Sequence, residues 1–171
     1  MRIIDLHCYP NTQKWIDCQG PYVDALEQYW GRAWQAKTEE EVVAEFKKFG
    51  IEAMLVALDL TTTIETPPCD NDYVAGMRDR HDAVIQAWAA VEPALGQAAV
   101  DEARHAINDL NMIGFHFHPI MQHIRVDDKS FYPLWEELTQ LKAPVMIDVG
   151  MTGMGAGMPG GLGAKTRNAH P

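Results

Sequence analysis

The stretch Ile51-Glu-Ala-Met-Leu-Val-Ala-Leu58 is almost wholly apolar and follows directly after Gly50. A run of this kind is typical of a parallel strand that helices cover on both faces. The residues before it predict a helix. Thr38, with Glu41 three positions on, forms a capping box, and Gly50 can adopt the left-handed conformation that ends a helix. The stretch therefore predicts a strand over 51–58 that a helix precedes.

The same alternation continues in both directions along the chain. We expect further strands at 2–7, 83–91, 112–118 and 144–149, and helical periodicity at 22–34, 42–49, 73–77, 99–110 and 131–141. Pro21 is placed to open the first of these helices, Asn71 to cap the helix that carries Met77, and Phe46 and Phe49 to lie in a buried stripe. From the strand at 51–58 onward, the strands begin about thirty residues apart, the length of a βαβ unit. No linker divides the chain, so we expect a single domain over 1–171.

Two α/β folds accommodate five such units in 171 residues. In a TIM barrel, of (β/α)8 type, the chain would supply only about the first five βα units, because such barrels need roughly 250 residues. In a five-stranded doubly wound sheet the fold would be complete at this length. Periodicity alone does not choose between them.

Composition excludes several classes of function. The net charge of −10, with Lys and Arg scattered along the chain, argues against a nucleic-acid partner. No apolar run is long enough for a membrane span or a secretory signal, so we expect no membrane association and a cytoplasmic location. Cys8, Cys18 and Cys69 are odd in number and form no C-x-x-C pair, which favours reduced thiols over a disulfide framework.

Polar residues stand at the end of every predicted strand. They are His7, Asp59, Glu92, His116 with His118, and Asp148. Active sites of parallel α/β folds lie at the carboxyl ends of the strands, so these side chains are expected at one rim. Asp59 and Glu92 could instead be exposed loop acids. His116 and His118 could instead be one core residue and one surface residue.

Alternation along the strands sharpens this expectation, because side chains two positions apart share a face. His7 shares a face with Tyr9, and His116 shares a face with His118. If these faces point inward, His7, His118 and Asp148 converge. Imidazole and carboxylate together suit a divalent ion such as Zn²⁺ or Mn²⁺, with a coordination position left open for water or substrate.

Six segments occur in the order seen in one enzyme family. They are Ile4-Asp-Leu-His-Cys-Tyr9, Asn71-Asp-Tyr-Val74, Trp88-Ala-Ala-Val-Glu-Pro93, Gly114-Phe-His-Phe-His-Pro119, Phe131-Tyr-Pro-Leu-Trp135 and Ala143-Pro-Val-Met-Ile-Asp-Val-Gly150. Together they resemble the amidohydrolase-related family, which contains aminocarboxymuconate semialdehyde decarboxylase and resorcylate decarboxylase. The resemblance spans nearly the whole chain and favours the TIM barrel over the doubly wound sheet.

The resemblance implies a metal-dependent hydrolase or decarboxylase that acts on a small aromatic or unsaturated carboxylate or acyl compound, in a homo-oligomer. It implies metal ligation by His7, His118 and Asp148, catalytic roles for His116 and His118, and substrate contacts from Tyr9 and His116. Two positions depart from the family pattern. Tyr9 stands where a second ligand of the first strand is usual, and Asp148 stands where the family has a histidine.

Two other functions stay open at this point. A truncated barrel could act only with a partner, or serve as a binding scaffold. A nucleotide-binding domain is suggested by the glycine-rich segment 150–163, in which Gly155-Ala-Gly-Met-Pro-Gly160 matches G-x-G-x-x-G. Pro159 interrupts the helix that such a fingerprint requires. The segment is therefore better interpreted as a mobile active-site loop after the last strand.

Overall fold

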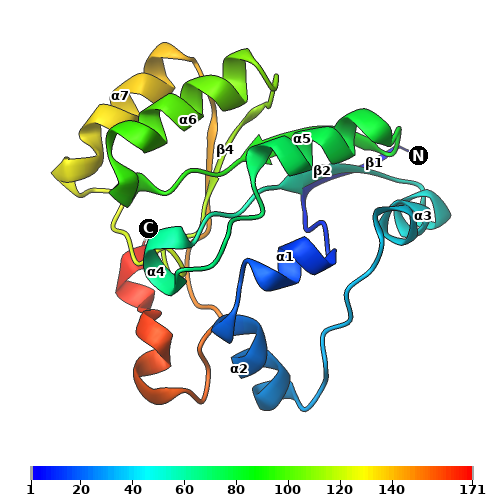
Figure 1. The fold of residues 1–171 in the computed structure, drawn as a ribbon, viewed down its shortest axis with the longest axis horizontal. Coiled ribbons are helices and arrows are strands. Elements are labelled where there is room, and N and C mark those ends of the chain that lie inside the picture. Colours follow the sequence, from blue (N-terminus) through cyan, green and yellow to red (C-terminus); the bar gives the residue numbers. More distant parts are fainter. Residues whose placement is uncertain (1, 171) are drawn as a thin grey trace.

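The computed structural model describes residues 2–170 and contains one parallel sheet of five strands (Figure 1). The strands are β1 (Ile3–Cys8), β2 (Ile51–Val56), β3 (Val84–Ala89), β4 (Gly114–Phe117) and β5 (Val145–Ile147). All five predicted strands are present. The strands β2 to β5 are each shorter than the apolar run that predicted them, and β1 begins one residue later and ends one residue later than predicted. Their order in the sheet is β1-β2-β3-β4-β5.

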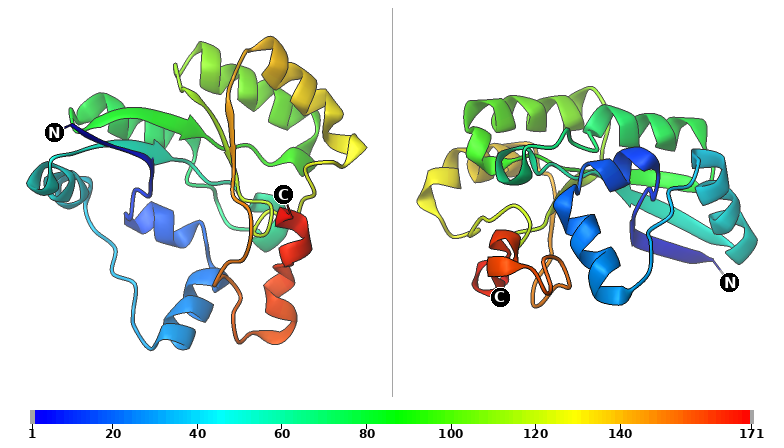
Figure 2. Two further views of the ribbon diagram at one scale, coloured as in Figure 1. Left: turned by 180° about the vertical axis from the view of Figure 1, so that it is seen from behind. Right: turned by 60° about the horizontal axis from the view of Figure 1, so that its bottom comes forward.

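This strand order decides between the two predicted folds. A doubly wound sheet reverses its order at one point and places helices on both faces. Here every strand pairs with the next one in sequence, and the helices that connect the strands cover one side of a curled sheet (Figure 2). The fold is therefore a curled half-barrel, the first five strands of a TIM barrel, and the doubly wound alternative is wrong.

The α-helices within residues 2–170 fall into two groups. Four of them follow the strands around the outside of the sheet: α3 (Glu39–Phe49), α5 (Asn71–Arg80), α6 (Gln97–Asn108) and α7 (Tyr132–Gln140). Three others, α1 (Gln13–Asp17), α2 (Pro21–Trp30) and α4 (Thr61–Ile64), lie in the connections that follow β1 and β2. Between β5 and residue 170 the chain forms only loops and the short 3₁₀ turns Pro159–Gly163 and Thr166–Ala169, and this segment lies beside α2 (Figure 1).

The core lies between the sheet and the outer helices. Phe115 and Phe117 of β4 are fully buried, and the Phe117 ring meets the Trp135 ring of α7 edge-on with centroids 5.1 Å apart. Small side chains such as Ala99 and Ala103 form the buried face of α6 and let the helix approach the sheet closely. Because alternate residues of a strand point to opposite faces, the side chain between the two phenylalanines points into the half-barrel.

Several local predictions are corrected. Helix α2 ends at Trp30 because Gly31 adopts the left-handed conformation, so Ala33 and Trp34 lie outside it. Phe49 is 62% exposed and does not belong to the buried stripe of α3. The cap of α5 is Asp70, whose side chain accepts from the Tyr73 N–H at 2.7 Å, and Asn71 is the first helical residue. Within residues 2–170, no helix is both long and apolar enough to cross a membrane.

Candidate metal centre

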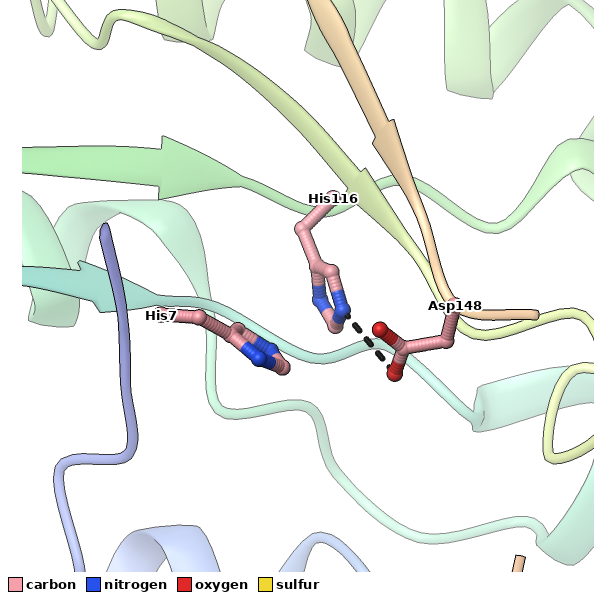
Figure 3. A group of neighbouring side chains, drawn as sticks. All are labelled: His7, His116 and Asp148. Atoms are coloured by element: carbon pink, nitrogen blue, oxygen red, sulfur yellow. Dashed lines mark ion pairs between the residues drawn. The ribbon is translucent and has the colours of Figure 1, made fainter. Parts of the chain in front are cut away.

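Three side chains from different strands meet at the carboxyl end of the sheet. His7 belongs to β1, His116 to β4, and Asp148 follows β5 directly. Each offers one ligating atom, and these atoms all lie within 4.8 Å of one another (Figure 3). Among the residues that the structure describes, this is the only group of three or more His, Cys, Asp or Glu side chains close enough to share one metal ion.

The sheet itself brings these residues together. The buried phenylalanines on either side of His116 face the helices, which turns the imidazole inward. His116 pairs with Met146 across the sheet, and the Asp148 N–H donates to the Phe117 carbonyl at 3.0 Å, which extends the ladder beyond β5. On β1 the register shifts between Asp5 and Cys8, and His7 lies within this irregular part.

The group lacks the hydrogen bonds that buried polar atoms normally make. Both ring nitrogens of His116 and Nε2 of His7 are buried and have no hydrogen-bond partner. His116 Nε2 lies 3.3 Å from Asp148 Oδ2, but the two atoms are not aligned as a hydrogen bond. The rings of His7 and His116 are 4.7 Å apart between centroids. Unsatisfied buried nitrogens are costly unless something binds them, so the arrangement fits a divalent metal ion.

The protonation states suit metal ligation. Burial, together with the neighbouring His116, lowers the pKa of His7. Burial also lowers the pKa of His118 to about 4, against the opposing pull of the Asp148 carboxylate. Burial opposes ionisation of Asp148, but the adjacent imidazoles, His116 foremost, outweigh it and hold its pKa below the ordinary value. Metal ligands must be neutral imidazoles and ionised carboxylates, and the pKa shifts of His7 and Asp148 favour these forms near neutral pH.

His118 lies beside the group rather than within it. The predicted set was His7, His118 and Asp148, whereas the tightest group contains His116 in place of His118. His118 Nε2 is nevertheless 3.5 Å from Asp148 Oδ2. Its Nδ1 accepts from the Met121 N–H at 3.3 Å, which fixes the ring and leaves Nε2 facing the carboxylate. His118 is therefore a fourth polar side chain of the site, and it lies beside the Asp148 carboxylate.

Gln122 is a supporting residue that the sequence did not reveal. It is buried, and its Oε1 accepts from the His118 N–H at 3.0 Å while its Nε2 donates to the Val91 carbonyl at 2.9 Å. The amide thus ties the loop after β4 to the loop after β3. An isolated glutamine four positions beyond a strand carries no sequence signal for this role, because the contacts depend on how the two loops fold.

Tyr9 closes one side of the site. Its ring stacks on Trp15 of α1 with centroids 4.9 Å apart and meets the His7 ring edge-on at 5.1 Å. A pocket of about 240 Å³ opens at this point and includes part of the glycine-rich segment. Its lining residues are His7, Tyr9, His118, Ile120, Asp148, Val149, Gly150, Met151, Thr152 and Ala169. The segment after β5 therefore contributes directly to the wall of the site.

Asp59 and Glu92 do not join this site. Both follow strands as predicted, but they line a different pocket that shares no residue with the one beside Asp148. Asp59 and Glu92 therefore lie after the carboxyl ends of β2 and β3, as predicted, but they do not reach the group formed by His7, His116 and Asp148. The alternative of two exposed loop acids is wrong for Glu92, which is 1% exposed.

The buried Glu92 carboxyl predicts a pH-dependent stability. Burial raises its pKa from 4.5 to about 7, and the nearby Asp59 carboxylate adds to the shift. Between these two values the folded state binds more protons than the unfolded state, so stability falls as pH rises from about 4.5 to above 7. We expect Glu92→Gln to remove this loss and to be about 2 to 3 kcal/mol more stable than the wild type at pH 8. Urea unfolding at pH 5 and pH 8 measures it, and equal effects at both pH values would contradict the assignment.

The fold is a partial TIM barrel, and the donor set at the carboxyl ends of its strands could hold a metal ion. The amidohydrolase family model matches residues 4–171, and the chain belongs to this family. The search of curated proteins gave no match.

Solved structures agree with this fold. The manganese-bound 5-carboxyvanillate decarboxylase of Novosphingobium aromaticivorans is similar with a TM-score of 0.66 at 17% identity, over 88% of this chain and 51% of its own. A manganese-bound dihydroxybenzoic acid decarboxylase of Polaromonas sp. gives 0.59 at 20%, over 88% and 51%. The 4-oxalomesaconate hydratase of Rhodopseudomonas palustris gives 0.54 at 14%, over 86% and 52%. The chain thus spans about half the length of these proteins.

Proposed function

We propose that the protein is a metal-dependent decarboxylase or hydrolase for small aromatic or unsaturated carboxylates or acyl compounds. One observation carries the proposal: buried imidazole nitrogens without hydrogen-bond partners surround a carboxylate at the mouth of the half-barrel. Family membership supports it, as do the decarboxylase and hydratase names of the structural neighbours. A cytoplasmic location and a homo-oligomeric state remain predictions.

His7, His116 and Asp148 would hold the metal. Mn²⁺ and Zn²⁺ both accept two imidazoles and one carboxylate, and two neighbouring structures contain manganese. When bound, the ion supplies Lewis-acid polarisation of a substrate oxygen and a bound water of lowered pKa. One carboxylate does not neutralise a divalent ion, so the site would retain positive charge and favour an anionic substrate.

The remaining side chains would orient the substrate and handle protons. Tyr9, braced against Trp15, offers a ring edge and a hydroxyl at one side of a pocket of about 240 Å³. His118 is fixed through its Nδ1 and presents Nε2 to the same space, where it can donate or accept a proton. Decarboxylation requires a proton for the carbon that loses carbon dioxide, and His118 is our candidate to pass on a proton taken up from solvent, because its lowered pKa keeps the imidazole neutral near pH 7.

The proposal is tested by measuring metal binding and product formation separately. We expect the Mn²⁺-loaded protein to bind hydroxybenzoates and to release carbon dioxide or hydrolyse an ester analogue. His118→Ala is expected to keep Mn²⁺ affinity within about threefold and to lower turnover at least about 100-fold. His105→Ala, which changes a surface histidine of α6, serves as the control. Failure of the metal-loaded protein to bind any aromatic carboxylate would refute the proposed substrate class.

The sheet edges support a second candidate function. Among residues 2–170, β1 pairs only with β2 and β5 pairs only with β4. Apolar side chains on these strands are exposed, including Leu6 at 55% and Val145 at 41%. Exposed apolar edges are a route to association, so the half-barrel could act with a partner segment that completes it. A soluble monomer that unfolds cooperatively, as judged by light scattering and calorimetry, would count against this alternative.

A further inference from the structure

A second pocket lies away from the metal centre. It has a volume of about 280 Å³ and is formed by the loops after β2 and β3 with the first turns of α5 and α6. Five acidic residues line it, and no Lys, Arg or His is among its lining residues: the acids are Asp59, Asp70, Asp72, Glu92 and Glu102. The proposed decarboxylase or hydrolase chemistry uses none of them.

Glu92 is the acid that the protein leaves unsatisfied. Its side chain is 1% exposed and lines the pocket. Oε1 accepts from the Ala94 N–H at 3.2 Å, whereas Oε2 is buried and has no hydrogen-bond partner of acceptable geometry, although Thr62 lies near the carboxyl. A buried carboxylate without a counter-charge is costly to ionise, and burial raises the pKa of Glu92 to about 7. A cation in the pocket would relieve this cost.

The other acids of the pocket already have partners. Asp70 caps α5 and pairs with Lys14, which approaches from outside the pocket lining. Asp72 lies 3.4 Å from His105 Nε2. Glu102 Oε1 accepts from the Asn71 amide at 2.6 Å, and Asp59 Oδ1 accepts from Thr61. These contacts hold the acids in place, but they supply only one lysine and one histidine for five acids, so the pocket stays strongly negative.

The spacing of the acids favours an organic cation over a metal ion. Within the described residues, no three acidic, histidine or cysteine side chains of this pocket come close enough together to share one ion, as those of the candidate metal centre do. The walls also contain apolar side chains, among them Leu58, Pro68 and Leu95. We infer that this pocket binds a small aliphatic amine or diamine, with an ammonium group paired to Glu92 and the alkyl chain against the apolar wall.

Calorimetric titration with 1,4-diaminobutane at pH 8 and low salt tests the inference. We expect saturable binding at one site in the wild type and at least a tenfold loss of affinity in Glu92→Gln. The matched control is Asp101→Asn on α6, which removes one negative charge from an exposed acid outside the pocket. It should keep the wild-type affinity within twofold. Circular dichroism checks the fold of each variant. If Glu92→Gln does not fold, Glu102→Gln provides a second pocket variant, which is also expected to weaken binding.

Three results would overturn the inference. The first is the absence of saturable binding in the wild type. The second is an equal loss of affinity in Glu92→Gln and Asp101→Asn, which would indicate a general charge effect. The third is a set of amine-induced amide shifts in nuclear magnetic resonance spectra that maps to His7 and Asp148 rather than to Glu92. None of these outcomes measures metal binding or turnover, so the amine proposal can fail while the proposed function holds, and the reverse.

Discussion

His116→Ala lowers the affinity of the protein for Mn²⁺ by at least about 100-fold, because it removes the most buried ligand of the proposed centre. The imidazole is 2% exposed and neither ring nitrogen has a hydrogen-bond partner. In the wild type, Mn²⁺ at 100 times its dissociation constant should stabilise the fold by about 2.7 kcal/mol. The variant should show almost no such stabilisation at the same metal concentration.

The control for this prediction is His105→Ala. His105 lies on α6, where its ion-pair partners are Asp72 and Asp109. The substitution therefore removes a histidine that does not belong to the proposed metal centre. Thermal unfolding with and without Mn²⁺ measures both variants. If His116→Ala kept the full metal-dependent stabilisation, the ion would have to bind elsewhere, and the assignment of the centre would be wrong.

Gly114→Ala destabilises the protein by about 3 kcal/mol and weakens metal binding at the same time. A Cβ atom at this position would lie 2.3 Å from the Pro144 carbonyl oxygen and 3.0 Å from Cζ3 of Trp88. The carbonyl is part of the sheet, since it accepts from the Phe115 N–H at 2.9 Å. The substitution therefore forces β5 away from β4, and with it the carboxylate of Asp148 away from His116.

Gly76→Ala is the matched control. Gly76 lies in α5, and its added Cβ would meet only the flexible end of the Arg80 side chain at 2.8 Å. Alanine is favoured over glycine in a helix, so this variant should be as stable as the wild type or slightly more stable. Urea unfolding and Mn²⁺ titration of both variants test the link between the sheet and the site. A Gly114→Ala protein with unchanged stability would show that β4 and β5 are not packed as described.

Much of the fold follows from local sequence features. The capping box of Thr38 and Glu41 forms as predicted, with both hydrogen bonds present, and Gly50 ends α3 in the left-handed conformation. The apolar run at 51–58 contains the second strand, Ile51–Val56. These features depend on neighbours in the sequence, so they can be predicted from it. Strand order depends on how the helices pack against the sheet, and only the family resemblance indicated it in advance.

The site was predictable in part. Strand ends and alternation predicted that His7 and Asp148 converge, and their side chains lie together in the structure, whereas their role as metal ligands stays a prediction. Alternation could not indicate that His116, rather than His118, lies closest to His7 and Asp148, because both side chains share a face and differ only in their position along the strand. The separate place of Glu92 also escaped prediction, since its burial depends on the loops after β2 and β3. Tertiary packing, which periodicity does not encode, decides both points.

The central claim is that His7, His116 and Asp148 bind one divalent ion at the mouth of the half-barrel. The most direct test is X-ray diffraction at the manganese absorption edge from crystals of the protein grown with Mn²⁺. We expect one anomalous peak about 2.0 to 2.3 Å from a ring nitrogen of each histidine and from a carboxylate oxygen of Asp148. A fully occupied peak elsewhere, or none at this position under saturating Mn²⁺, would contradict the account.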